Sequence, residues 1–102
     1  APRFLVIGRE FFSPSGHDRT SLLVFVRDQP GALYNVLSPF ARHGVSMNRI
    51  ESRPAHSGRW QYVFFIDVSG HVEEGNVAQA MSELGEYASD VVVLGSYPVA
   101  LL

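Results

Sequence analysis

The order of helical and extended segments restricts this chain to a small number of folds. Strand-like segments occupy residues 21–27, 46–54, 60–68 and 90–98. Apolar residues at helical spacing predict a first helix through Leu33, Val36, Leu37, Phe40 and Ala41, and a second through Val77, Ala80, Met81 and Leu84. The resulting order, β-α-β-β-α-β, predicts an α+β, ferredoxin-like fold: a four-stranded antiparallel sheet with two helices on one face.

The predicted sheet has apolar residues on both faces. Residues 21–27, SLLVFVR, are apolar at successive positions, which is typical of a central strand buried on both sides. In residues 60–68 one face carries Trp60, Tyr62, Phe64 and Ile66, and the other carries Val63 and Phe65. Because two helices cover only one face, a second apolar face or edge predicts a partner, and self-association is the natural one. The alternative is that the N-terminal segment covers that face.

Composition excludes several classes of function. The 102 residues are 46% apolar and carry 8 basic against 10 acidic side chains, for a net charge of -2. This balance provides no basic face for nucleic acid or an anionic membrane. There is no cysteine, which excludes thiol chemistry. No signal-peptide pattern is visible in these residues, and no apolar run in them is long enough to span a membrane. We therefore predict a cytoplasmic domain that binds neither nucleic acid nor membrane.

No arrangement of residues indicates catalysis or a metal site. The histidines are scattered and lack the spacing of metal ligands; they are His17, His43, His56 and His71. The sequence has no nucleophile elbow and no phosphate-binding glycine loop. Asp28 and Glu51 are the tempting pair of carboxylates, and each has a simpler role. The sequence predicts no catalytic residue, no metal and no cofactor.

The loop before the first helix is suited to binding an amino acid. At a helix N-terminus the first backbone N–H groups lack partners and the dipole is positive, so a carboxylate is favoured there. Pro30 sits near the helix start, and Gly31 and Ala32 are small and leave that end open. Asp28 either accepts an ammonium group or caps the helix, and Gly31 either admits a ligand or serves close helix–sheet packing. The spacing leaves these alternatives open.

The sequence ESRP at residues 51–54 is unusual inside a strand. Strands favour β-branched and aromatic residues, and they confine proline to edges, ends and bulges. Strand alternation places Ile50 toward the helices, and Arg49 and Glu51 on the opposite face. Glu51, between two arginines, is suited to a cross-strand or cross-subunit ion pair, and Pro54 is expected to end the strand. We expect the motif to organise an interface rather than to do chemistry.

Two motifs together resemble a known regulatory domain. The sequence PGALY, followed by LSPFARHGVSMNRIESRP, is similar to the ACT domain of prephenate dehydratases, including bifunctional chorismate mutase/prephenate dehydratases. The resemblance covers about residues 19–98 and continues through WQYVFFIDVSGH and LGSYP. The regulatory ACT domain of phenylalanine hydroxylases also has GAL and ESRP motifs. The LGSYP ending and the N-terminal RFLVIGRE, which resembles the last strand of the dehydratase catalytic domain, favour the dehydratase.

The resemblance divides the chain into two parts. Residues 1–17 are expected to be a leader, the remnant of the end of a catalytic domain plus a linker, and residues 18–102 are expected to be the ACT regulatory domain. This chain alone is therefore expected not to be an enzyme, whereas its parent chain is expected to be a prephenate dehydratase, a lyase. Pro2 stands where the family has a threonine implicated in catalysis.

The resemblance also implies a ligand and partners. L-Phenylalanine, the pathway's end product, is expected to bind between the two ACT domains of a homodimer and to inhibit the catalytic domain of the same parent chain. The GAL motif would meet the head group, and ESRP, on a neighbouring strand, would close or brace the site. Ser46 and Asn48 depart from the family, which more often has Asn and then Ser or Thr there. The expected binding residues are Asp28, Pro30, Gly31, Ala32, Leu33, Ser46, Met47, Asn48, Glu51, Ser52, Arg53 and Pro54.

Other functions remain open on the sequence. The chain is alternatively the regulatory ACT domain of an aromatic amino-acid hydroxylase, or a dimerisation module whose ligand pocket is empty. RNA recognition is a further function of this fold, but RWQYVFFI lacks both glycines of the RNA-binding signature. A response to L-phenylalanine separates a regulatory domain from a ligand-free module.

Overall fold

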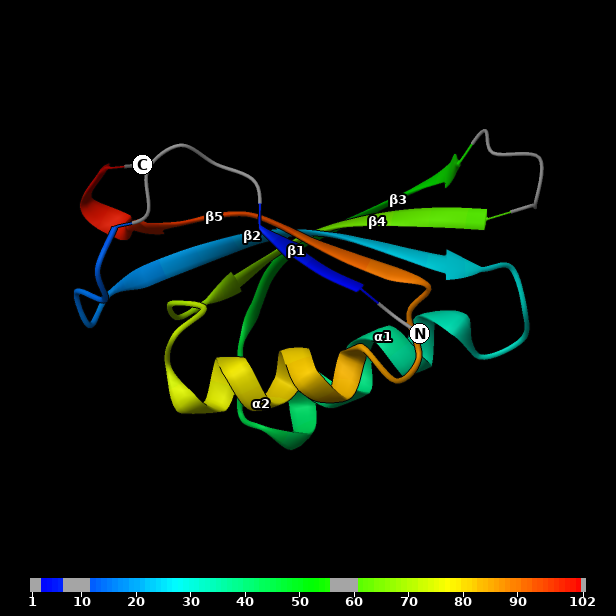
Figure 1. The fold of residues 1–102 in the computed structure, drawn as a ribbon, viewed down its shortest axis with the longest axis horizontal. Helices are drawn as coiled ribbons and strands as arrows, with labels where there is room; N and C mark the ends of the chain where they lie inside the picture. Colours follow the sequence, from blue (N-terminus) through cyan, green and yellow to red (C-terminus); the bar gives the residue numbers. More distant parts are fainter. Residues whose placement is uncertain (1–2, 7–11, 56–60, 102) are drawn as a thin grey trace.

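The computed structural model describes residues 3–6, 12–55 and 61–101, which form one sheet with two helices beside it (Figure 1). The elements in chain order are β1 (Arg3–Val6), β2 (Asp18–Arg27), α1 (Ala32–Arg42), β3 (Met47–Ala55), β4 (Gln61–Ser69), α2 (Gly75–Leu84), β5 (Asp90–Pro98) and a short 3-10 helix (Val99–Leu101). The predicted strands and helices are all present, and the last strand has the predicted bounds, 90–98.

The sheet has five strands in the order β1-β5-β2-β4-β3. β2 pairs antiparallel with both β4 and β5, and β3 pairs antiparallel with β4. The ferredoxin-like βαββαβ order with a four-stranded antiparallel sheet is therefore confirmed. β1 extends that sheet by a fifth strand, which runs parallel to β5. The strand that carries ESRP, β3, lies at one edge of the sheet, and β4 lies between it and β2.

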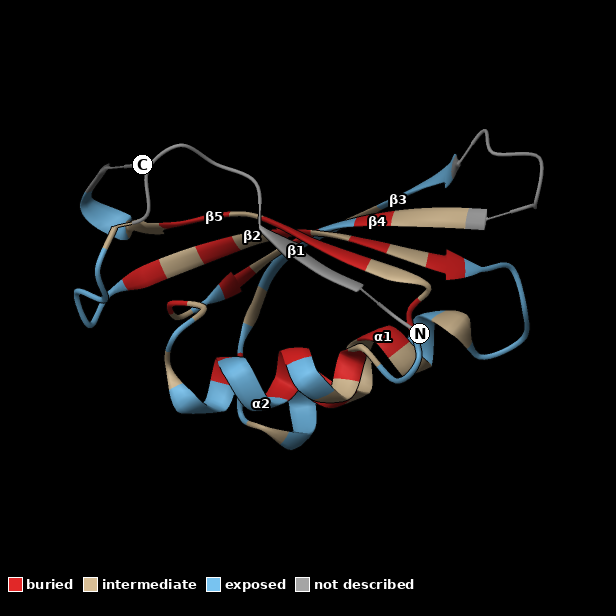
Figure 2. Ribbon diagram, in the orientation of Figure 1, coloured by how far each residue is buried: buried red, intermediate tan, exposed pale blue. Residues whose placement is uncertain are grey.

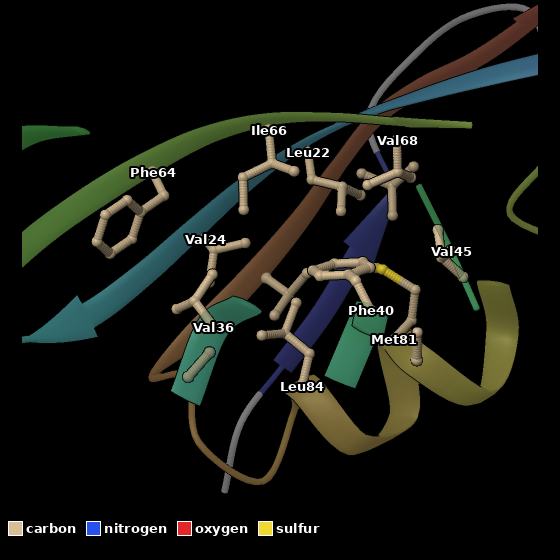
Figure 3. Close-up of a cluster of buried hydrophobic side chains, with 14 of the residues drawn as sticks. Leu22, Val24, Val36, Phe40, Val45, Phe64, Ile66, Val68, Met81 and Leu84 are labelled. Atoms are coloured by element: carbon tan, nitrogen blue, oxygen red, sulfur yellow. The ribbon is translucent and has the colours of Figure 1, made fainter. Parts of the chain in front are cut away.

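Both helices cover the same face of the sheet, and the hydrophobic core lies between them and it (Figures 1 and 2). Phe40 and Met81 point from the two helices toward Leu22 and Val68 of the sheet (Figure 3). The predicted core face of α2 is confirmed, because Val77, Ala80, Met81 and Leu84 are all buried. This hydrophobic core holds α1 and α2, including their ends, in place relative to the strands.

Two sequence predictions about buried faces need correction. β2 is central but is not buried on both sides: Leu22 is fully buried, whereas Leu23 is half-buried, because the helices cover one face only. In α1, Phe40 is buried as predicted, but Leu33 and Ala41 are exposed. The helix therefore buries a narrower stripe of side chains than its apolar residues predict, and part of its apolar surface stays exposed to solvent.

The sheet face away from the helices carries apolar side chains, as the sequence predicted. Phe25 and Val63 are half-buried there, and Phe65 is 37% exposed. Phe64, on the opposite face of the same strand, is buried against the helices. The predicted contribution of Trp60 lies outside the described residues.

The strand register defines two ends of the sheet that matter for the site. Arg27 and Ala55 lie in one row across β2, β4 and β3, which we call the Arg27 end. Thr20 and Met47 lie in another row across the same strands, which we call the Thr20 end. Seven residues of β2 separate the rows, about 23 Å at roughly 3.3 Å per residue. α1 begins beyond the Arg27 end and leads back to the Thr20 end (Figure 1).

Candidate functional site

The start of α1 is open, as an anion-binding helix end requires. Gly31 is the N-cap residue, with a left-handed backbone at φ 82°, and no side chain caps the helix. The N–H of Ala32 donates to the carbonyl of Gln29. Within the described part of the chain, the N–H groups of Leu33 and Tyr34 have no hydrogen-bond acceptor. Two unpaired donors and the positive end of the helix dipole therefore lie at the GAL motif.

Two alternatives that the sequence left open are decided by this geometry. Asp28 is exposed and does not cap α1, so its carboxylate is available to another group. A Cβ built on Gly31 meets nothing within 4 Å, so close packing of helix and sheet does not explain the glycine. Its left-handed backbone explains it instead, because other L-residues adopt that conformation at a cost.

The ESRP residues lie on an edge strand, which explains how proline and charges fit there. β3 pairs on one side only, with β4, and it continues through Pro54 to Ala55, so the prediction that Pro54 ends the strand is wrong. Arg53 lies over the ring of Phe65, 5.9 Å from its centroid, in a cation–π contact. This contact is on the sheet face away from the helices, which we call the open face. Pro54 pairs with Tyr62 in the ladder register.

Glu51 pairs with an arginine of its own strand. Its Oε1 accepts hydrogen bonds from Nη2 of Arg49 at 2.6 Å and from Nε at 3.2 Å. Among the described residues this partner replaces the predicted cross-strand one, because alternation brings residues two apart to the same face. The alternative of a cross-subunit pair stays a prediction. The hydrogen bond and charge of Arg49 lower the pKa of Glu51 below its ordinary value of 4.5. Glu51 thus stays ionised at neutral pH and presents a paired, exposed carboxylate on the open face.

The structure divides the predicted binding residues between two ends of the domain. The residues before and at the start of α1 lie at the Arg27 end; they are Asp28, Pro30, Gly31, Ala32 and Leu33. The residues at the start of β3, Ser46, Met47 and Asn48, lie at the Thr20 end. ESRP occupies the middle and the Arg27 end of β3. The roughly 23 Å between the ends is too long for one amino acid to bridge within one chain.

An open hollow of about 300 Å³ lies at the Thr20 end. It is lined by polar side chains that include His17, Asp18, Ser46, Ser69, Glu74 and Asn76. Ser46 alone among these was predicted from the sequence. The other five come from three separate segments that the fold brings together, so spacing along the chain gave no signal for them.

A buried polar cluster next to this hollow was also missed. Thr20 donates its hydroxyl proton to the carbonyl of Gly70 at 2.7 Å and accepts a 2.8 Å hydrogen bond from the Ser96 hydroxyl. His71 is fully buried and bonds to the carbonyl of Phe12. The only sequence signal is a threonine and a serine at helix-facing positions of strands, where apolar residues are the rule.

Acid is expected to weaken the cluster through Asp18. The Ser15 hydroxyl donates to Oδ1 of Asp18 at 2.6 Å, and the Ser15 N–H donates to Oδ2 at 2.8 Å. The Ser15 hydroxyl is the main cause that lowers the pKa of Asp18 below its ordinary value of 3.8. A lowered folded-state pKa stabilises the fold above about pH 3.8, and this contribution is lost as pH falls through the folded-state value.

Ser15→Ala tests that contribution. The variant should be less stable than the wild type at neutral pH, and the difference should shrink between about pH 5 and about pH 2 because protonated Asp18 loses its advantage in both proteins. Urea unfolding across this range measures it, with Ser13→Ala, an exposed serine nearby, as the control. A difference that stays constant with pH would contradict the assignment.

The described residues show no metal cluster and no spanning helix. Residues 3–6, 12–55 and 61–101 contain no group of three or more His, Asp or Glu side chains placed to hold a metal ion. None of the helices in these ranges has the length and apolar character needed to cross a bilayer.

Comparison with known proteins identifies relatives of this chain. The chain is 51% identical over 100 residues to the bifunctional chorismate mutase/prephenate dehydratase of Aquifex aeolicus, covering 98% of this chain and 28% of the relative. It therefore spans less than a third of that relative's length. A 2.0 Å crystal structure of prephenate dehydratase from Arthrobacter aurescens in complex with L-Phe matches with a TM-score of 0.81 and 38% identity, over 91% of this chain and 31% of that one.

A protein of different described activity shares the fold. The structure of GqqA, described as a novel type of quorum-quenching acylase, matches with a TM-score of 0.83 and 35% identity, over 91% of this chain and 48% of that one. The sequence profile of the ACT domain matches residues 20–86, which is more than half of the chain. Together with the sheet order and the GAL and ESRP motifs, this match shows that the chain belongs to the ACT domain family, in the form carried by prephenate dehydratases.

Proposed function

We propose that this chain is the L-phenylalanine-binding regulatory domain of a prephenate dehydratase, and that it gives feedback inhibition in phenylalanine biosynthesis. The observation that carries the proposal is the open start of α1, with unpaired N–H groups at Leu33 and Tyr34. It occurs in a chain 38% identical to a prephenate dehydratase crystallised with L-Phe. Residues 1–17 are proposed to belong to the end of the catalytic domain and its linker, and 18–102 to the regulatory domain.

The start of α1 matches the head group of an amino acid. Its free N–H groups and positive dipole suit the ligand's carboxylate, and the exposed Asp28 carboxylate suits its ammonium group. Leu33 is 48% exposed beside them and offers apolar surface for an aromatic ring. The carboxylate, ammonium group and ring of an aromatic amino acid would thus each find a matching group at this one place.

A homodimer would complete this site. When two copies pair along the same edge about a two-fold axis, the edges run antiparallel. The Arg27 end of one chain then lies beside the Thr20 end of the other. If the edges formed by α1 and β3 meet in this way, Gly31 of one chain lies next to Ser46 and Asn48 of its partner. Exposed apolar side chains on those elements, Leu33, Tyr34 and Ile50, support this edge as the interface. The division of the predicted residues between two ends is then expected, because each site takes one end from each chain.

ESRP would lie near the centre of that interface and brace it. Glu51 is the middle residue of β3, so a two-fold axis between antiparallel copies of this strand passes close to it. Glu51 with Arg49, and Arg53 on Phe65, would then orient the two chains. Inhibition follows as a population shift, because a ligand bound by both chains favours one packing of the pair over others.

A thermal-shift titration of this chain tests the proposal. L-Phenylalanine at 100 times its dissociation constant should stabilise the folded state by about 2.7 kcal/mol, because it binds the folded state only. For a domain of this size that corresponds to a rise in Tm of roughly 10 °C. L-Serine, which has the head group without the ring, is the control. No rise with any aromatic amino acid would contradict the proposal and would favour a ligand-free dimerisation module.

Other functions have less support. The matching relatives favour the dehydratase over an aromatic amino-acid hydroxylase. An acylase would require an activated nucleophile, and within the described residues no hydroxyl is hydrogen-bonded to an imidazole. A cytoplasmic location stays part of the proposal, and the cysteine-free composition agrees with it without establishing it.

A further inference from the structure

The buried polar side chains of the described residues gather at one place. They are Asp18, Thr20, His71 and Ser96, and each is at most 4% exposed. They come from the start of β2, the loop before α2 and the end of β5. All four are hydrogen-bonded, which is what burial of polar groups requires. The cluster therefore fixes several segments against one another at the Thr20 end.

His71 attaches the segment before β2 to this cluster. Its Nδ1 accepts a hydrogen bond from the Glu73 N–H at 3.1 Å, so Nδ1 carries a lone pair. Its Nε2 then carries the proton and donates to the carbonyl of Phe12. A second attachment of residues 12–15 to the cluster is formed by Ser15, whose N–H and hydroxyl donate to the Asp18 carboxylate. This is the segment that joins β1 to β2.

The loop that carries His71 is hydrogen-bonded to β2 and packs closely against α2. Gly70 has φ 114°, and a Cβ there would lie 2.7 Å from Cγ2 of Val77 in α2. Its N–H donates to the Asp18 carbonyl at 2.7 Å, and its carbonyl accepts from Thr20. A displacement of this loop therefore moves His71 and its contact with Phe12 together.

The same loop touches proposed ligand-binding residues. The Ser69 hydroxyl donates to Oδ1 of Asn48 at 3.1 Å, and the Ser69 N–H donates to the carbonyl of Ser46 at 2.8 Å. Ser69 precedes Gly70 directly. A continuous series of hydrogen-bonded groups thus runs from Asn48 through Ser69 and the Gly70 loop to His71 and Phe12.

We propose that His71 is a positioning residue that transmits ligand occupancy at residues 46–48 to the segment 12–15. This inference rests on the proposed function, in which residues 1–17 lead to the catalytic domain. A ligand that holds Asn48 and Ser46 in place also restrains Ser69 through its two hydrogen bonds. The Gly70 loop, hydrogen-bonded to β2, then carries that restraint to His71 and the Phe12 carbonyl. The regulatory signal then leaves the domain through hydrogen bonds to the linker rather than through the apolar core.

Amide hydrogen exchange at Ser15 reads the state of this segment. His71→Phe replaces the imidazole by a slightly larger apolar ring and removes both imidazole hydrogen bonds. Exchange at Ser15 should become about ten-fold faster in this variant, the change that corresponds to about 1.4 kcal/mol for a lost hydrogen bond. Saturating L-phenylalanine should slow this exchange at least two-fold in the wild type and leave it unchanged in His71→Phe, while still raising the Tm of both. Unaltered exchange in His71→Phe would overturn the proposal.

Two further variants separate coupling from folding. Ser69→Ala removes an exposed hydroxyl, so it should keep wild-type exchange without ligand and lose the response of Ser15 to L-phenylalanine. His17→Asn removes an exposed imidazole from the same segment and should behave as the wild type. Retention of the full response in Ser69→Ala would overturn the route. If L-phenylalanine does not raise the wild-type Tm, the proposed function fails and the coupling with it, whereas faster exchange in His71→Phe still supports the attachment of the segment.

Discussion

Replacing Phe40 by alanine is expected to lower the free energy of unfolding by about 3–5 kcal/mol, as for other large aromatic truncations in cores. Phe40 is 1% exposed and lies between α1, α2 and the sheet (Figure 3). Alanine removes the transfer energy of the ring and leaves a cavity, and neighbours such as Met81 and Leu84 fill it only in part. Domains of this size have a total stability of about 5–15 kcal/mol, so the variant should be near the threshold of folding.

Urea unfolding measured by circular dichroism gives this value directly. Gln79→Ala is the control, because Gln79 is exposed on α2 and lies outside the proposed interface. Its effect should stay within about 0.5 kcal/mol, as for surface substitutions in general. A loss below about 1 kcal/mol in Phe40→Ala would mean that α1 does not pack on the sheet as described here.

The same contrast shows how far the sequence predicts the fold. The period of Val77, Ala80, Met81 and Leu84 gave the buried face of α2 without error. In α1, periodicity also predicted burial for Leu33, which is 48% exposed. Helical spacing reports that residues share a face and does not report whether a partner inside the same chain covers it. Leu33, the apolar side chain that stays exposed, is the one proposed to contact a ligand and a second chain.

Edge position is another property that spacing along the chain does not contain. The sequence identified ESRP as unusual and placed it on a strand, but the pairing order that makes β3 an edge depends on contacts far apart in the chain. The partner of Glu51 was misjudged for a related reason: Arg49, two residues away, reaches it first. The cluster around His71 was missed because its members come from separate elements and form no motif. Local patterns give the elements, and three-dimensional pairing gives the sites.

The second large effect is expected at Gly31. Gly31→Ala should weaken L-phenylalanine binding by about 10- to 100-fold, which corresponds to losing charge-assisted hydrogen bonds worth about 1.5–3 kcal/mol. The added methyl group would project into the open space at the start of α1 and would disfavour the φ of 82° that presents the helix N–H groups. Gly44→Ala is the matched control. Gly44 has φ 66° at the other end of α1, and a Cβ there also meets nothing within 4 Å.

The two glycine variants separate strain from binding. Both should lose about 1–2 kcal/mol of stability, because an L-residue with a side chain pays that for a left-handed backbone. Isothermal titration calorimetry should then show near wild-type affinity in Gly44→Ala and a large loss in Gly31→Ala. Equal loss of affinity in both variants would mean that binding depends on the stability of α1 and not on its N-terminus.

Mixing two defective chains tests whether each site takes residues from both. In the proposed dimer, one site joins Gly31 of the first chain with Asn48 of the second, and the other site joins the reverse pair. Asn48→Ala and Gly31→Ala homodimers should both bind weakly, since each carries a defect in every site. A heterodimer of the two has both defects in one site and none in the other, so refolding an equimolar mixture should restore one strong site per heterodimer. No restoration would mean that each substitution disables the site of its own chain, and it would contradict the shared site. Because one amino acid does not bridge the roughly 23 Å between the two ends of the sheet, Asn48 would then affect the site at Gly31 without contacting the ligand.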